Sequence, residues 1–323
     1  MLEENTLKVH IHCRLERRVA TPAGEACSRD TAGAKATRRL GTCPAESVHP
    51  QRKSTRFYFN RKEKEQIMIK NIAYGAVLSL QFLTRFPLPI ACDINEASMK
   101  WALRFFPFAG FIIGGFMSLI YIVLSPIFPE TIMTIALLSA WVYATGGLHL
   151  DGWMDVADAL GSNAPLEKKY EIMKDSRVGS FAVIAVIFLF AWKAVILYEL
   201  LTVIDNQHII LALLFIPMLA RFQALLQLKL FPAIQNKGLA HEWRKYLSWR
   251  EIVIAFVGIA VMIIIYFPFM FLFVLQVLFT ILFGKWAVNN FKGINGDLVG
   301  TSIEGAELWN VAILYIFILF VMV

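Results

Sequence analysis

The amino-acid sequence predicts an all-α integral membrane protein, a polytopic bundle of about seven transmembrane helices preceded by an interfacial or re-entrant helix. The first of three observations is composition: 58% of the 323 residues are hydrophobic and 17% are charged, whereas roughly a quarter of a typical soluble domain is charged. The second is the length of the apolar runs, since 181–201 and 307–323 approach the ~20 residues that cross a bilayer. The third is that the connections between such runs alternate between charge-poor and rich in Lys and Arg.

The alternating connections predict the topology. Three short connections carry no Lys or Arg, namely 125–131, 202–208 and 264–271. By the positive-inside rule the basic connections on the other side face the cytoplasm, so we expect a multi-pass protein of the cytoplasmic (inner) membrane, surrounded by lipid. The expected cytoplasmic loops are 149–177, 221–250 and 285–304. The predicted spans are 107–127, 131–147, 179–201, 208–220, 251–266, 269–284 and 306–323.

A further segment, 71–86, precedes the first predicted span. It contains Gln81 and Arg85, and it has to return to the side on which it starts. We therefore expect it to lie in the membrane interface or to be re-entrant.

The first 67 residues do not share the apolar pattern. They carry 14 of the 31 Lys and Arg residues, and their cysteines Cys13, Cys27 and Cys43 lack metal-ligand spacing. One interpretation is a basic arm attracted to anionic lipid. We prefer a disordered extension, residues 1–67, ahead of a functional membrane domain at 68–323, because Met68 begins an apolar segment typical of an N-terminus. Since most of the net charge of +7 comes from this extension, it indicates no nucleic-acid partner.

The stretch GGLHLDGWMDVADALG, residues 146–161, places Asp151, Asp155 and Asp158 between apolar segments. On a helix, positions i, i+4 and i+7 lie within roughly 60° of one another, so the three carboxylates share one face. Carboxylates this close repel one another unless a cation neutralises them, and hard oxygen ligands suit magnesium, manganese or calcium; magnesium commonly bridges a few carboxylates to substrate phosphates. The alternative is a solvated acidic helix end, which is costly beside a bilayer. The spacing therefore favours a metal site.

Further polar residues are predicted on the same side of the membrane. They are Lys174, Asp175 and Arg177 in EIMKDSRVGSF, Lys237 and His241 in FPAIQNKGLAHEW, and Asp297 and Glu304 in a glycine-rich turn, GINGDLVGTSIEG. Each of them alone could be an ordinary solvated residue. Together, basic groups beside a metal site suit a phosphate or pyrophosphate substrate.

Several of these strings resemble the cobalamin synthase family, the adenosylcobinamide-GDP ribazoletransferases. They occur in the family's order and cover nearly all of residues 68–323, whereas the first 67 residues match nothing in the family. The strings are LQFLTRFPLP, FFPFAGFIIGG, GGLHLDGWMDVADALG, EIMKDSRVGSF, ARFQ with FPAIQNKGLA, and GINGDLVG.

The resemblance implies a magnesium-dependent transferase of cobalamin biosynthesis. Such an enzyme joins adenosylcobinamide-GDP to α-ribazole, or to α-ribazole 5′-phosphate, and releases GMP at the cytoplasmic membrane. The resemblance leaves open whether the protein forms a homo-oligomer or binds other cobalamin-assembly enzymes.

The reaction assigns roles to the residues singled out above. The expected metal ligands are Asp151, Asp155 and Asp158. A base is needed for the ribazole 5′-hydroxyl, and the candidates are Asp158, Asp175 and His149, the last of which could equally serve in packing. Lys174 and Arg177 are expected to bind phosphate oxygens, and Lys237 and Asp297 are further candidates for substrate binding.

Two alternatives remain open, one of them from a different functional class. A CDP-alcohol phosphotransferase also displaces a nucleotide with spaced aspartates, but those enzymes carry an Ala-Arg pair after the first Asp-Gly, whereas WMDV follows here. A membrane transporter is suggested only by Lys193 and Glu199 within a predicted span, and both could snorkel or pair locally. Transporters usually contain internal repeats, and this sequence has no convincing one. Substrate-dependent release of GMP would distinguish an enzyme from a transporter.

Overall fold

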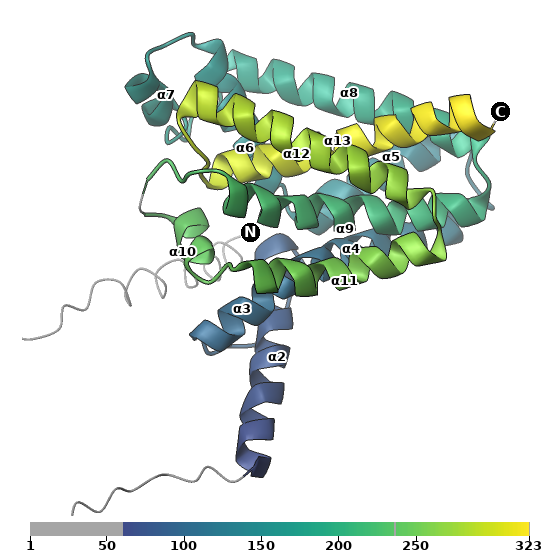
Figure 1. The fold of residues 1–323 in the computed structure, drawn as a ribbon. Coiled ribbons are helices and arrows are strands. Elements are labelled where there is room, and N and C mark those ends of the chain that lie inside the picture. Colours follow the sequence, from purple (N-terminus) through teal and green to yellow (C-terminus); the bar gives the residue numbers. More distant parts are fainter. Residues whose placement is uncertain (1–60, 236, 323) are drawn as a thin grey trace, which may run out of the picture. The chain divides into compact units, whose positions relative to one another are not determined.

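The computed structural model describes residues 61–235 and 237–322, and it confirms an all-α architecture for that part of the chain. Residues 1–60, most of the predicted extension, lie outside the described residues. Contacts divide the chain after Gln66, so α2 begins in the first unit, and every contact and site described below belongs to the unit that begins at Ile67. The helices in Figure 1 are α2 (Arg61–Leu83), α3 (Glu96–Arg104), α4 (Phe106–Leu124), α5 (Glu130–Thr145), α6 (Leu148–Gly161), α7 (Leu166–Ile172), α8 (Ser180–Val203), α9 (Asn206–Leu230), α10 (Leu239–Lys245), α11 (Trp249–Ile265), α12 (Phe269–Phe291) and α13 (Gly296–Phe317), with a π-helical end (Ile318–Met322).

The long helices run lengthwise through one bundle, and the short helices α6, α7 and α10 lie together at one end of it (Figure 1), which we call the loop end. Among the described residues, five helices are long and apolar enough to cross a membrane. The number rises to seven when each of two bent pairs, α5 with α6 and α10 with α11, counts as one span. The structure therefore agrees with a multi-pass membrane protein of the predicted size.

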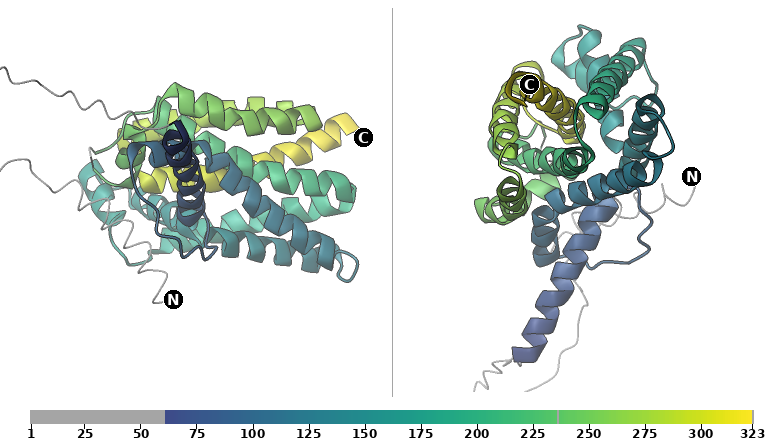
Figure 2. Two further views of the ribbon diagram at one scale, coloured as in Figure 1. Left: turned by 90° about the horizontal axis from the view of Figure 1, so that it is seen from below. Right: turned by 90° about the vertical axis from the view of Figure 1, so that its right-hand side faces the viewer.

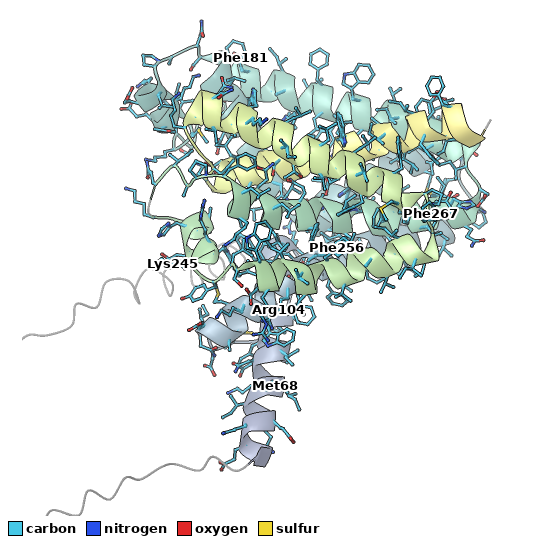
Figure 3. The ribbon with its side chains drawn as sticks, viewed as in Figure 1. Met68, Arg104, Phe181, Lys245, Phe256 and Phe267 are labelled. Carbon is cyan, nitrogen blue, oxygen red and sulfur yellow. The ribbon has the colours of Figure 1, made fainter. Side chains whose placement is uncertain are left out.

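Large apolar side chains cover the outside of the bundle. Figure 3 shows Phe181 at the loop end and Phe267 at the opposite end, and their exposed fractions are 48% and 75%. Between them, Trp192 and Val257 are also more than half exposed. A soluble monomer rarely exposes so much apolar surface, and lipid acyl chains are the surroundings that suit it.

Three helices extend beyond their predicted spans. α9 continues to Leu230, α12 continues to Phe291, and α13 begins at Gly296, so much of the predicted loops 221–250 and 285–304 is helical. The prediction that a loop begins at Arg221 is wrong, because this residue lies inside α9 and is fully buried. The prediction placed a span end at a charged residue, but a paired charge can remain inside a helical bundle.

The segment predicted to be interfacial or re-entrant lies within α2. From Ile67 onwards, α2 runs across the direction of the long helices in Figure 1, and it is seen nearly end-on in the left view of Figure 2. After α2 the chain returns in an extended segment, which Gln81 fixes by donating hydrogen bonds to the carbonyls of Leu88 (2.7 Å) and Ile90 (2.9 Å). A helix that lies across the spans agrees with the interfacial prediction.

The helix α13 packs against α6, α8, α9 and α12, and a buried charge network fixes its middle. Lys193 Nζ on α8 lies 2.6 Å from Glu304 Oε2 and 3.0 Å from Glu307 Oε2, both on α13. Arg221 on α9 pairs with the other oxygen of Glu307, and the Lys193 ammonium also lies 4.9 Å from the centre of the Trp141 ring. Two cations and two anions therefore balance inside the bundle. Lys193 pairs locally, so its presence within a span does not need a transport pathway to explain it.

Candidate functional site

A sharp turn places α6 across the end of α5. Gly146, the C-cap of α5, and Gly147 both have positive φ, 66° and 72°, which glycine adopts without the strain that other residues meet. The two helices meet at 92°. α6 then runs from Leu148 to Gly161, so the predicted helix for the aspartate stretch is confirmed.

A fourth carboxylate joins the three aspartates of α6, and we call these four residues, Asp151, Asp155, Asp158 and Asp297, the acid cluster. Asp297 lies in the first turn of α13, whose N-cap, Asn295, accepts a hydrogen bond from Leu298 N (2.9 Å). The negative charges of the other three members all act on Asp155. No salt bridge joins Asp151, Asp155 or Asp297 to a basic side chain in the part of the chain that is described. The site therefore concentrates negative charge at the loop end.

Close contact between α6 and α13 brings the acid cluster together. A Cβ at Gly152 would lie 2.7 Å from the carbonyl oxygen of Asp297, so only glycine permits this approach. The Thr301 hydroxyl lies within hydrogen-bond distance of the carbonyls of Gly152 (2.9 Å) and Asp297 (2.7 Å). Gly152 and Thr301 are thus positioning residues for Asp297.

Asp297 was predicted to lie in a glycine-rich turn together with Glu304, and this prediction is wrong. Both residues are helical, and Glu304 is buried in the charge network about two turns further along α13. Asn295 two residues before Asp297 is a typical N-cap residue and could have signalled the helix start. Gly152 and Thr301 carry no such signal, because their role depends on the contact between two distant helices.

Asp158 has a structural contact that the sequence did not predict. Its two carboxylate oxygens accept hydrogen bonds from the backbone amides of Gly179 (2.7 Å) and Ala182 (2.8 Å) at the start of α8. It therefore caps α8 from a neighbouring helix, where the helix dipole also favours a negative charge. A carboxylate has further lone pairs, so the roles of Asp158 as metal ligand and as base stay predictions.

The loop between α7 and α8 carries Lys174, Asp175 and Arg177. Asp175 Oδ2 lies 2.6 Å from Arg177 Nη2, and this hydrogen-bonded guanidinium lowers the pKa of Asp175 to about 2. A base works best with a pKa near the working pH, so Asp175 is a weak proton acceptor while this pair persists. Lys174 and the 87% exposed Arg177 side chain are accessible to a soluble ligand.

The remaining predicted residues lie around the same end of the bundle. His149 in the first turn of α6 is buried, and Lys237 lies exposed just before α10, which carries His241. Within the described residues, no hydrogen bond or ion pair joins Lys174, Arg177 or Lys237 to the acid cluster. The substrate-binding roles of these basic residues stay predictions.

The donor chemistry of the acid cluster suits a hard divalent cation. Among the described residues, no group of three or more His, Cys, Asp or Glu side chains is placed so that it could hold a metal ion by itself. Magnesium often takes only one or two carboxylates and completes its shell with water and substrate phosphates. One or two carboxylates from among Asp151, Asp155 and Asp297, which have no basic partner in the described part of the chain, could hold such an ion together with water and substrate phosphate.

Comparison with known proteins gives a consistent result. The family model described as cobalamin-5-phosphate synthase matches residues 75–315. A relative from Halalkalibacterium halodurans is 33% identical over 252 residues, which cover 76% of this chain and 96% of the relative. Relatives from Brevibacillus brevis (35% over 240 residues, 71% and 92%) and Listeria monocytogenes (34% over 235 residues, 72% and 93%) are similar in the same way, and all three are called adenosylcobinamide-GDP ribazoletransferase. No solved structure matches the chain.

Proposed function

The chain belongs to the cobalamin-5-phosphate synthase family, and from this premise we propose that it is an adenosylcobinamide-GDP ribazoletransferase that works at the acid cluster. Its membership makes it a transferase of cobalamin synthesis. The reaction forms a bond between the ribazole 5′-oxygen and the phosphorus attached to cobinamide, breaks the pyrophosphate bond and releases GMP. The observation that carries the proposal is the convergence of four carboxylates from α6 and α13 without a basic partner for three of them among the described residues.

Magnesium is part of the proposal. One or two of the carboxylates of Asp151, Asp155 and Asp297 would hold the ion, and a bound magnesium would neutralise negative charge on the pyrophosphate and on the departing GMP. Lys174 and Arg177 in the loop before α8 would bind phosphate oxygens of the nucleotide. These roles agree with the general pattern of phosphoryl transfer, in which positioning and charge neutralisation supply most of the rate enhancement.

The 5′-hydroxyl has to lose its proton during the reaction. Of the three predicted bases, Asp158 is engaged in capping α8, and Asp175 is held as a weak base by Arg177. His149 borders the same cavity as Asp151 and Asp297. We therefore propose that His149 is the base that accepts the proton of the 5′-hydroxyl. A His149→Gln variant should lose activity without losing nucleotide binding.

The orientation in the membrane is also a proposal. The connections at the loop end contain Lys168, Lys174 and Arg177 as well as Lys237, and such basic loops favour the cytoplasmic side of an inner membrane. A cysteine at the exposed Ser162 should therefore resist an impermeant thiol reagent in intact cells and react after lysis. Labelling in intact cells would contradict this orientation.

Product formation tests the function directly. The full-length protein in lipid vesicles is incubated with adenosylcobinamide-GDP, α-ribazole and magnesium, and GMP is measured. GMP should appear only when both substrates are present, and a chelator should stop its release. Release of GMP without α-ribazole, or no release at all, would contradict the proposal.

A further inference from the structure

A cavity of about 150 Å³ lies beside the acid cluster, between α2, α4, α6, α9, α10 and α13. One wall is polar and consists of His149, Asp151 and Asp297. The other walls are mainly aromatic and aliphatic. The cavity therefore combines an apolar interior with a charged wall where the chemistry is proposed to occur.

Three packed aromatic rings form part of the lining. The ring centres of Phe82 and Trp243 are 5.2 Å apart, those of Phe106 and Trp243 are 5.3 Å apart, and those of Phe82 and Phe106 are 6.1 Å apart. Trp243 is 4% exposed, and its indole N–H has no hydrogen-bond partner among the described residues. The cavity thus offers flat apolar contacts and one unused donor.

We propose that this cavity binds the aromatic base of α-ribazole, with the ribose directed towards Asp151 and Asp297. The inference rests on the proposed function. A dry apolar cavity of about this volume accepts a single benzene ring, so it can take the benzo end of a benzimidazole while the imidazole ring and ribose lie towards the polar wall. Aromatic side chains stack favourably on such a base.

The polarity of the lining favours this base over guanine. A benzimidazole that carries a ribose retains one acceptor nitrogen and no N–H or carbonyl group, which suits apolar walls and the single N–H of Trp243. Guanine carries an amino group, a ring N–H and a carbonyl, and each of these would lose its hydrogen bonds to water against apolar walls. The polar side chains that it could reach are His149, Asp151 and Asp297, to which the proposed function already assigns proton transfer and magnesium.

The direction of the reaction gives an independent reason. In phosphoryl transfer the attacking and leaving oxygens lie roughly in line on opposite sides of the phosphorus. Asp151 borders the cavity, whereas Asp158, about 10 Å further along α6, contacts the start of α8 next to the Lys174–Arg177 loop. The cavity and the basic loop therefore flank the acid cluster, one suited to the attacking ribazole and the other to the departing GMP.

A substitution that fills the cavity tests the assignment. Ala240 on α10 lines the cavity and is only partly buried, so Ala240→Phe should narrow it with little strain on the core. We expect the KM for α-ribazole to rise roughly tenfold or more, and the KM for adenosylcobinamide-GDP to change less than about twofold. The free base 5,6-dimethylbenzimidazole should inhibit the native enzyme competitively with α-ribazole, and Ala240→Phe should weaken that inhibition.

A matched control is available in a second apolar cavity between α6, α8, α12 and α13, which Ala185 lines. Ala185→Phe adds the same side chain there and should leave both KM values unchanged. Should Ala240→Phe fold poorly, Trp243→Phe keeps an aromatic ring but removes the N–H together with the five-membered ring of the indole. This second variant should raise the KM for α-ribazole several-fold, and calorimetry with α-ribazole should show the same loss of affinity.

Each result supports or overturns the assignment. A selective rise in the KM for adenosylcobinamide-GDP would identify the cavity as a guanosine site and overturn it. Unchanged KM values in both Ala240→Phe and Trp243→Phe would also overturn it. Failure of the proposed function is distinguishable, because the unsubstituted protein would then release no GMP from the two substrates.

Discussion

Two groups of carboxylates, each with members on α13, differ in how their charge is balanced. Asp297 in the first turn of α13 joins the acid cluster, where the described residues supply no basic partner for it. Glu304 and Glu307, two to three turns further along α13, pair with Lys193 and Arg221. The first group is unbalanced and lies at the loop end, and the second is balanced and buried in the middle of the bundle.

The difference indicates what each group does. Buried charges are retained when a partner compensates their lost hydration, so the paired network is suited to holding α8, α9 and α13 together. Adjacent carboxylates without partners repel one another, and folding does not favour such a group unless a ligand supplies the opposite charge. We therefore expect substitutions in the acid cluster to affect turnover and those in the network to affect folding.

The largest expected effect is on turnover at Asp155. Asp155→Asn removes one charge from the acid cluster with little change in size, and we expect activity to fall roughly a thousandfold. Initial rates of GMP release at limiting and saturating magnesium measure this. Because one ion serves several ligands, the Asp151→Asn/Asp155→Asn double variant should be scarcely worse than the poorer single variant.

The control for this prediction is Glu167→Gln on α7, an exposed acid at the same end of the bundle but outside the acid cluster. It should retain nearly full activity. If Asp155→Asn were as active as Glu167→Gln at limiting magnesium, the acid cluster would be an ordinary polar surface.

Substitutions in the charge network should lower the free energy of unfolding. Glu307→Gln leaves the buried Arg221 guanidinium without its carboxylate, and removing one partner of a buried pair typically destabilises by about 3–5 kcal/mol. Thermal unfolding in detergent should show a much lower Tm, while the molecules that remain folded keep normal KM values. Adding Arg221→Met removes the unpaired charge and should recover part of the loss.

Glu199→Gln is a matched control for the network, since it makes the same change on the spanning helix α8 at a partly exposed position. Its Tm should stay close to that of the native protein. Equal effects of Glu199→Gln and Glu307→Gln would show that the network does not hold the helices together.

Asp158 belongs to the acid cluster and also caps α8, so its substitution should affect both turnover and folding stability. Asp158→Asn replaces one acceptor oxygen with an amide that cannot accept from the α8 backbone, and loss of a cap typically costs about 1 kcal/mol. Asp155→Asn should show no such loss, because it relieves repulsion. Chemical denaturation of the two variants measures the difference, and equal stabilities would contradict the capping role.

The sequence predicted those parts of the site that depend on local spacing. The aspartates of α6 follow the helical repeat within one short stretch, and the structure confirms that helix. The pairing of Arg221 with Glu307 joins residues 86 positions apart, and no local pattern reveals it. The prediction assumed that a charged residue ends a span, and for this reason the predicted spans were shorter than α9 and α13.

The capping of α8 by Asp158 was hidden for a related reason. Its partners, Gly179 and Ala182, offer only backbone amides, which every residue except proline possesses. The same spacing that correctly placed Asp158 beside Asp155 could not show that its oxygens turn towards another helix. The residue types alone predicted that the site is negatively charged. Only the packing of the helices shows that Asp158 caps α8 whereas Asp155 does not.

The smallest expected effect comes from removing residues 1–67. They carry 14 of the 31 Lys and Arg residues, so their removal changes the net charge of the chain without removing any member of the acid cluster. If magnesium supplies the positive charge that the acid cluster needs, a chain that starts at Met68 should insert into the membrane with kcat and KM changed less than about twofold, because the deletion removes none of the carboxylates of the acid cluster or of the charge network.

The truncated chain also separates the two sources of positive charge. GMP release is measured for it and for the full-length protein over a range of magnesium concentrations. Overlapping curves would show that the extension contributes nothing to the acid cluster. A truncated chain that inserts normally but needs much more magnesium would show that basic residues of the extension neutralise the cluster, and the contrast between an unbalanced site and a balanced network would then hold only for the membrane domain.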